Sequence, residues 1–234
     1  MSEKKIKDSN FIEVVNIFNK NKINYWLCHG TLLGIIRDQK LIDWDHDIDL
    51  ALWENDTNRE QIIKLLVDNG FVLRKGFQIK DDIISFFKKG GRIVDINFYI
   101  RKKLKKTNEK VAYIRWYVPK NIFCKLIDGL SNSRKYNGKF KIVIKLGFLF
   151  QEFFEFLKYI LIKYNFFYKE IGYSEPEYLL NDIKKIRIDD LEIRIPSSPE
   201  KYLAYLYGHN WKIPKKDYIW HKDSNALTSS KKLK

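Results

Sequence analysis

Carboxylates occupy every second position of one short segment, at Asp43, Asp45, Asp47 and Asp49. Alternate side chains of an extended strand point to the same side, so this spacing predicts a row of carboxylates along one strand face. Carboxylates that close repel one another unless a cation lies among them. Oxygen ligands without a neighbouring cysteine or paired histidine favour a hard ion, so we expect Mg²⁺ or Mn²⁺ here.

A phosphate-binding turn is predicted directly upstream of the aspartates. The apolar residues 23–28 predict a strand that ends at Gly30, and Thr31 can cap a short helix whose free N–H groups face an anion. Arg37 adds a fixed positive charge for the same anion. The alternative is a solvated edge strand after an ordinary turn, but Ile48 and its apolar neighbours supply a buried face. Together these features indicate phosphoryl or nucleotidyl transfer.

A further carboxylate, Asp95, lies in a strand-like run between branched apolar residues. Burying an acid in such a strand is costly unless something compensates it. It could instead point outward and pair with Arg92. We favour the interpretation that places Asp95 beside Asp47 and Asp49.

Residues 27–53 combine His-Gly-Thr-Leu-Leu-Gly at 29–34, Arg37, and Trp-Asp-His-Asp-Ile-Asp-Leu at 44–50. This combination resembles the signature of the LicD/fukutin family, which includes bacterial phosphocholine transferases and fukutin-related ribitol-phosphate transferases. A weaker resemblance covers residues 195–214, with Trp211 among its positions. His46 departs from the pattern, because bacterial members often carry another aspartate there.

The resemblance implies an α+β fold, with a nucleotidyltransferase-like mixed β-sheet flanked by helices and interrupted by a helical insertion. We expect residues 1–120 to form the nucleotidyltransferase-like core. Residues 121–185 are then a helical insertion with a long amphipathic helix, and residues 186–234 complete the core.

The implied reaction moves a phospho-alcohol, such as phosphocholine, from a CDP-activated donor to a sugar hydroxyl of a surface glycan or glycolipid, with release of CMP. In this interpretation the metal ligands are Asp47, Asp49 and Asp95, with Asp45 as a weaker candidate. Asp95 is also the candidate base. The substrate-binding residues are His29, Gly30, Thr31, Arg37 and Trp211.

The formal charge of +15 across 234 residues points to polyanionic partners: nucleic acid, an anionic membrane or a phosphorylated glycolipid. The alternative function is therefore a nucleotidyltransferase that acts on RNA, protein or a small molecule with an NTP donor, or a basic nucleic-acid-binding module. The basic residues are spread along the chain and no RNA-binding motif occurs, so nucleic acid is the less favoured partner.

Periodicity predicts helices over 8–21, 55–69 and 199–207, strands over 71–74, 83–88, 93–100 and 111–118, and a hairpin over 186–195. Residues 101–110 are predicted to be a solvated loop, and residues 228–234 a frayed basic tail. The two cysteines, Cys28 and Cys124, do not form a disulfide framework.

Residues 139–170 predict one long helix, with charged residues in a narrow arc and a wide face rich in Phe, Ile and Leu. That face either packs on the domain or lies in the plane of a membrane, and the charges exclude a helix that crosses a bilayer.

The N-terminus lacks an apolar segment, so we expect a cytoplasmic protein, with possible contact at the inner membrane face.

Overall fold

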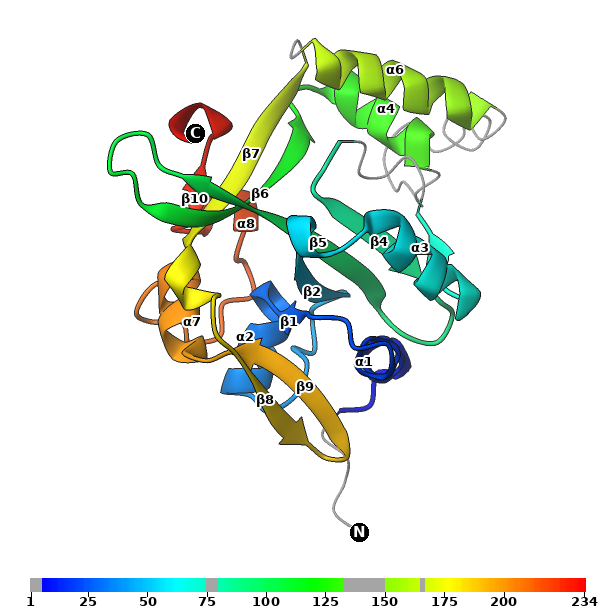
Figure 1. Cartoon of the computed structure of the whole chain (residues 1–234). Helices are drawn as coiled ribbons and strands as arrows, with labels where there is room; N and C mark the ends of the chain where they lie inside the picture. Colours follow the sequence, from blue (N-terminus) through cyan, green and yellow to red (C-terminus); the bar gives the residue numbers. More distant parts are fainter. Residues whose placement is uncertain (1–5, 75–79, 133–149, 165–166) are drawn as a thin grey trace.

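A mixed β-sheet organises the chain, and the computed structural model describes residues 6–74, 80–132, 150–164 and 167–234 (Figure 1). The strands are β1 (Trp26–Leu27), β2 (Asp47–Trp53), β3 (Val72–Leu73), β4 (Ile83–Phe87), β5 (Ile93–Lys103), β6 (Lys110–Pro119), β7 (Tyr168–Pro176), β8 (Ile183–Ile188), β9 (Leu191–Pro196) and β10 (Leu227–Thr228). The α-helices are α1 (Ser9–Lys20), α2 (His29–Arg37), α3 (Arg59–Asp68), α4 (Ile122–Asn132), α6 (Gln151–Lys163), α7 (Pro199–Tyr207) and α8 (Trp220–Asp223).

The main sheet has eight strands within the described residues, in the order β1-β2-β5-β6-β7-β10, with β4 paired to β5 and β3 to β4. The β2–β5 pair is parallel, and the other pairs are antiparallel. Strands β8 and β9 form a separate hairpin. The expected α+β architecture, a mixed sheet flanked by helices, is therefore confirmed.

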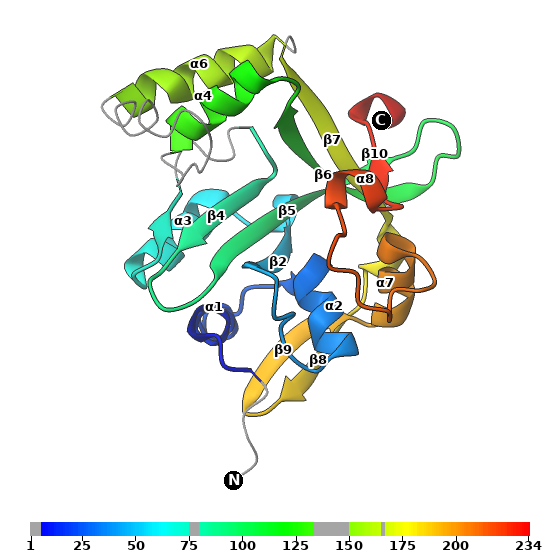
Figure 2. The same ribbon diagram turned by 180° about the vertical axis from the view of Figure 1, so that it is seen from behind.

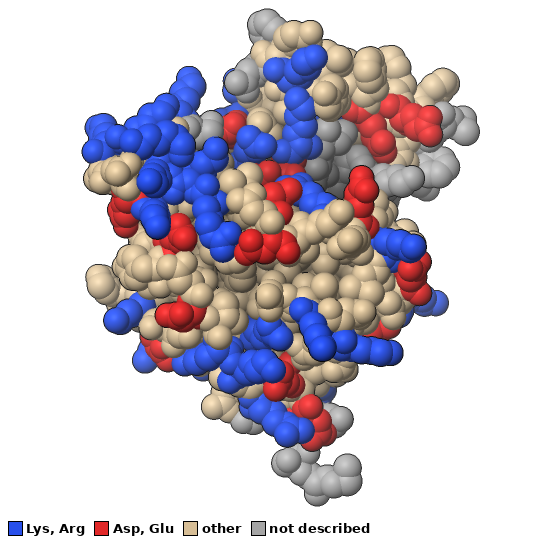
Figure 3. All heavy atoms as spheres, viewed as in Figure 1, with Lys and Arg blue, Asp and Glu red and all other residues tan. Residues whose placement is uncertain are grey.

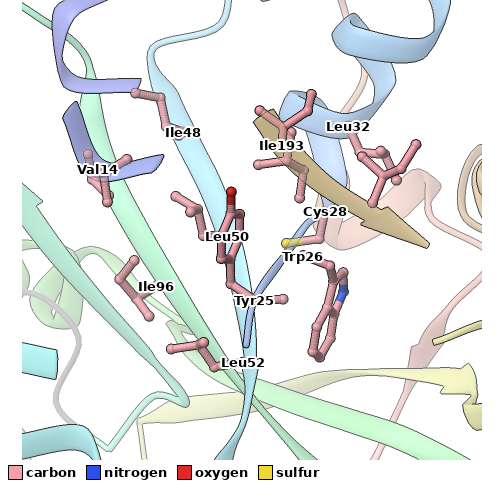
Figure 4. Packing of buried hydrophobic residues seen from close by; sticks show 14 of the residues in the cluster. Val14, Tyr25, Trp26, Cys28, Leu32, Ile48, Leu50, Leu52, Ile96 and Ile193 are labelled. Atoms are coloured by element: carbon pink, nitrogen blue, oxygen red, sulfur yellow. The ribbon is translucent and has the colours of Figure 1, made fainter. Parts of the chain in front are cut away.

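The core lies between the sheet and a layer formed by α1, α2 and the β8–β9 hairpin (Figures 1 and 2). Leu50 of β2 and Ile96 of β5 face Val14 of α1 and Ile193 of β9, and all four side chains are buried (Figure 4). Elements from both ends of the chain thus share one interior, and they pack against the strands β2 and β5 that carry the aspartates.

Most of the predicted elements are confirmed to within a few residues. Helix α1 begins with Asp8 as its N-cap, which accepts a hydrogen bond from the backbone N–H of Phe11 at 3.0 Å. Asn10 is buried in the first turn and donates to the backbone oxygens of Lys88 and Arg92. It therefore holds the β4–β5 turn against α1.

The loop predicted over residues 101–110 is confined to the turn between β5 and β6, so its predicted bounds were too wide, and the prediction of a frayed tail over residues 228–234 was wrong. Strand β5 continues through Lys103, and β6 already begins at Lys110. The C-terminal residues pair with this β5–β6 hairpin, because Lys103 and Lys234 exchange backbone hydrogen bonds of 3.1 and 2.9 Å. Leu233 is buried beneath this pairing and explains why the tail does not fray.

The prediction of one long helix over 139–170 was also wrong in its described part. Helix α6 ends at Lys163, and β7 begins at Tyr168; residues 133–149 and 165–166 lie outside the described residues. The charged arc does not all face water either. Lys158 is buried and forms an ion pair of 3.0 Å with Asp128 of α4.

Among the described residues, no helix has both the length and the apolar character needed to span a membrane. Cys28 and Cys124 are both buried free thiols.

Candidate active site

The aspartate segment forms a turn followed by a strand, rather than one long strand. Asp47 and Asp49 lie on β2 with their side chains on the same face. Asp45 precedes the strand, and Asp43 is exposed and forms an ion pair of 2.7 Å with Lys40. The predicted row of four is therefore corrected to two strand carboxylates, with Asp45 beside them.

The parallel pairing of β2 with β5 places Asp95 directly beside Asp49. The Ser85 hydroxyl on β4 donates a hydrogen bond to Asp95. The alternative partner, Arg92, instead forms an ion pair of 3.7 Å with Asp8. The interpretation that paired Asp95 with Arg92 at the surface was therefore wrong.

Helix α2 places its first turn against these carboxylates. Its N-cap is Cys28, and the predicted capping role of Thr31 was wrong: the Thr31 hydroxyl accepts a hydrogen bond of 2.8 Å from the backbone N–H of Asp49. A Cβ at Gly30 would lie 2.3 Å from Oδ2 of Asp45. Glycine at this position therefore lets the helix backbone approach the carboxylate.

The carboxylates perturb one another strongly. Burial, and then the charges of Asp47, Asp95 and Asp45, hold the pKa of Asp49 well above its usual range. Burial and the charge of Asp47 raise the pKa of Asp45 to about 7. In the described chain, no set of three or more histidine, cysteine, aspartate or glutamate side chains is already arranged as a metal site. A bound cation would reduce the repulsion that raises these pKa values.

The carboxylates and the first residues of α2 line a cavity of about 610 Å³: His29, Gly30, Asp45, Asp47, Asp49 and Asp95, but not Thr31. Arg74, at the end of β3, also lines it; burial lowers the pKa of its guanidinium, and the charge of Asp95 opposes that shift. Of the predicted substrate-binding residues, Arg37 pairs with Asp38 at 2.7 Å and Trp211 is buried in the core, and neither lines this cavity. The structure thus brings Arg74 to the carboxylates, a cation that the sequence prediction missed.

The rest of the cavity is built by the later part of the chain. One wall is aromatic: the ring centroid of Trp116 lies 4.8 Å from that of Tyr173 and 5.1 Å from that of Trp220. The lining also includes Asp128 and Lys158 from the α4–α6 pair. The cavity therefore combines a cluster of carboxylates, an aromatic wall and a second set of charged side chains.

His29 is held in the cavity wall by a buried chain of hydrogen-bonding groups. The Tyr99 hydroxyl lies 3.2 Å from Nε2 of His29 and donates to Oε1 of Glu175 at 2.9 Å. The φ angle of His29 is 48°, a left-handed value that is unusual for a non-glycine residue and typical of functional sites. Burial lowers the pKa of His29 to about 4 and raises that of Glu175 to about 8, so burial favours the neutral form of both groups.

The sequence prediction did not identify Asn97 or Glu175. Asn97 is fully buried on β5, and its amide lies 3.3 Å from Oδ1 of Asp49. Its position two residues after Asp95, on the same strand face, was a usable signal. Glu175 had no such signal, because the segment that forms β7 was not predicted to be a strand.

Comparison with known proteins adds an independent observation. Residues 22–130 match the family model described as LicD/FKTN/FKRP, nucleotidyltransferase domain. The matched segment contains α2, β2 and β5, and therefore all of the candidate carboxylates.

Individual relatives are similar over shorter segments. The chain is 34% identical over 71 residues to the human and mouse ribitol 5-phosphate transferase FKRP, a match that covers 28% of this chain and 14% of FKRP. It is 29% identical over 94 residues to the protein RP689 of Rickettsia prowazekii, covering 37% of this chain and 35% of that protein. The chain therefore matches about a third or less of each relative's length.

Among solved structures, the lincosamide antibiotic adenylyltransferase LnuA, in a lincomycin-bound crystal structure, superposes with a TM-score of 0.41 and 12% identity over 83% of each chain.

Proposed function

Because residues 22–130 belong to the LicD/FKTN/FKRP nucleotidyltransferase family, we propose that this chain is a metal-dependent phosphotransferase. The donor is a CDP-activated alcohol such as CDP-choline or CDP-ribitol. The acceptor is a sugar hydroxyl of a glycan or glycolipid, and CMP is released. The observation that carries the proposal is the shared cavity, in which the carboxylates of Asp49 and Asp95, the Arg74 guanidinium and an aromatic wall all lie.

The donor set fits a hard divalent cation. Asp47, Asp49 and Asp95 offer only oxygen ligands, with Asp45 beside them, and the raised pKa of Asp49 arises partly from charges that a cation would compensate. Mg²⁺ or Mn²⁺ bound there would neutralise the diphosphate and stabilise the leaving CMP. Removing the ion is expected to leave the fold intact, since none of these aspartates belongs to the hydrophobic core.

In the proposed reaction, the acceptor hydroxyl oxygen attacks the phosphorus that carries the alcohol, and the phosphoanhydride bond to CMP breaks. Asp95 takes the proton from the attacking hydroxyl. Arg74 offsets negative charge on the transferring phosphate, and the aromatic wall around Trp116 supplies a surface for the cytosine ring. The carboxylate of Asp128 and the ammonium of Lys158 can accept and donate hydrogen bonds to sugar hydroxyls.

A thermal-shift screen tests the donor class. Each of CDP-choline, CDP-ribitol, CDP-glycerol, CDP-ethanolamine and the NTPs is added with Mg²⁺, because a ligand that binds only the folded state raises the melting temperature. At a concentration of about 100 times Kd, stabilisation of about 2.7 kcal/mol corresponds to a shift of about 5–10 °C. Stabilisation by NTPs but by none of the CDP-alcohols would support the alternative nucleotidyltransferase function instead.

Asp95→Asn is expected to slow transfer by a factor on the order of 10²–10⁴, while the donor still binds, because the proposed base acts only when the acceptor loses its proton. Single-turnover rates and donor titrations with metal check the two quantities separately. Ser85→Ala, which removes the hydroxyl that donates to Asp95, is the matched control and should change the rate far less. If donor affinity falls together with the rate in Asp95→Asn, the residue is chiefly a metal ligand.

A further inference from the structure

The β5–β6 hairpin and the C-terminal segment are joined by backbone pairing. Leu104 forms a β-bridge with Leu233, and the backbone N–H of Lys105 donates to the oxygen of Lys232 at 2.9 Å. Leu233 is 7% exposed and packs with Val111 and Tyr113. This small apolar cluster holds together two segments that are rich in lysine.

The pairing collects exposed lysines on one surface, which we name the basic hairpin patch: Lys102, Lys103, Lys105, Lys106, Lys110, Lys231, Lys232 and Lys234. Figure 3 shows this surface as the dense blue area beside the hairpin. Glu109 is the one acidic residue within the same two segments, 102–110 and 231–234. Bringing so many like charges together is unfavourable in isolation, and an anionic surface would relieve their repulsion.

A second unusual surface lies on the α4–α6 pair. Large aromatic side chains are exposed there, which we name the aromatic face: Phe123, Phe150, Phe153, Phe156 and Tyr159, with exposed fractions of 52, 62, 58, 63 and 40%. The last three recur every third residue on α6 and therefore share one side of the helix. Lys125 of α4 and Lys163 of α6 are exposed on the same two helices.

The two surfaces lie at opposite ends of the β6–β7 pair. Strands β6 and β7 connect them, with the hairpin at one end of β6 and α4 after the other. Figures 1 and 2 show both in the upper half of the molecule, with the hairpin and the C-terminus on one side and the α4–α6 pair on the other. Exposed aromatic side chains on one region and clustered lysines on another are both features by which peripheral proteins contact the headgroup region of an anionic bilayer.

We propose that the basic hairpin patch and the aromatic face together form a docking surface for an anionic lipid bilayer. The lysines are attracted to the lipid headgroups, and the rings of Phe153 and Phe156 enter the interface. Single-stranded nucleic acid fits less well, because it needs aromatic rings interleaved with the basic groups along one groove. In this protein the exposed rings and the lysine patch occupy separate elements.

Vesicle flotation of the full chain tests the proposal, with phosphatidylcholine alone and with equal parts of phosphatidylcholine and phosphatidylglycerol. We expect binding to the anionic vesicles only, and weaker binding as salt is raised. Replacing Lys102, Lys103, Lys106 and Lys232 by glutamine should lower the partition coefficient about fivefold per lysine, or roughly two to three orders of magnitude in all. The matched control replaces Lys20, Lys64, Lys184 and Lys201, which are exposed elsewhere, and should have a much smaller effect.

The aromatic face is tested separately. Phe153→Ser with Phe156→Ser should reduce the binding that persists at high salt, whereas Val72→Ser with Ile213→Ser, 61 and 68% exposed elsewhere, should not. Glu152→Lys, on the exposed side of α6, changes the charge by two units and should strengthen binding to anionic vesicles about 25-fold. All of these side chains are largely exposed, and circular dichroism verifies that the variants fold.

Three outcomes would overturn the proposal. The first is failure to float with anionic vesicles. The second is tight binding to poly(U) that the same four lysine substitutions abolish, without vesicle binding, which assigns the patch to nucleic acid. The third is a dimer in solution that Phe153→Ser with Phe156→Ser dissociates, without any effect on flotation, which assigns the aromatic face to a second copy of the chain.

Discussion

Replacing Asp49 by asparagine is expected to abolish phospho-alcohol transfer and to raise the melting temperature of the metal-free protein. Asp49 lies between Asp47 and Asp95, and its raised pKa shows that its negative charge is unfavourable in the folded state without a cation. Removing that charge relieves the repulsion. Transfer should fall by a factor on the order of 10³ or more, because the loss of a metal ligand removes several kcal/mol of transition-state stabilisation.

Turnover assays and thermal melts with and without Mg²⁺ measure both effects. Asp43→Asn is the matched control, because Asp43 is exposed and paired with Lys40, and it should alter neither quantity appreciably. Addition of Mg²⁺ should stabilise the wild-type protein but not the Asp49→Asn variant. Near-normal turnover in that variant would exclude the proposed metal site.

Glu175→Gln is expected to remove part of the pH dependence of stability. Burial raises the pKa of Glu175 from 4.5 to about 8, so between these values the folded state binds a proton that the unfolded state has released. The contribution of Glu175 to the free energy of unfolding is therefore fully present below about pH 4.5 and is lost as pH rises toward 8. Between these two pH values the free energy of unfolding falls by about 1.4 kcal/mol per pH unit. The total loss is roughly 5 kcal/mol as an upper bound.

Urea denaturation of the wild type and the variant at several pH values checks this result. Glutamine keeps an oxygen that can accept the Tyr99 hydroxyl hydrogen bond, so the variant should fold and be the more stable protein near pH 8. Glu200→Gln, on the exposed side of α7, is the control and should retain the wild-type slope. Equal slopes for wild type and Glu175→Gln would show that Glu175 is ionised in the folded protein at neutral pH.

The sequence was most informative where periodicity and chemistry agreed. Asp47 and Asp49 alternate with buried apolar residues on β2, so both the strand and the face that carries the carboxylates were predictable. The neighbour relation between Asp49 and Asp95 needed the additional assumption of a nucleotidyltransferase-like sheet. The structure places these side chains in adjacent positions through the parallel β2–β5 register.

Proximity along the chain was a poor guide to the remaining site residues. Arg37 was assigned to phosphate because it follows the Gly-Thr turn, but it lies at the far end of α2, where Asp38 neutralises it. Arg74 reaches the cavity from β3, through a pairing that no local pattern specifies. Strand β7 was missed because its first residues continue the aromatic pattern of α6, and only pairing with β6 determines its extended form.

The β6–β7 pairing has a consequence for how the chain can vary in length. Pro119 and Tyr168 are opposite partners, so everything between them is topologically the loop of one hairpin. The entropy of closing a loop grows only with the logarithm of its length, so doubling it costs about 0.6 kcal/mol. The sheet register is set by strand pairing on either side, independently of the size of the connection. Helices can therefore be added, shortened or exchanged at this position while the candidate carboxylates, which precede it in the chain, keep their places.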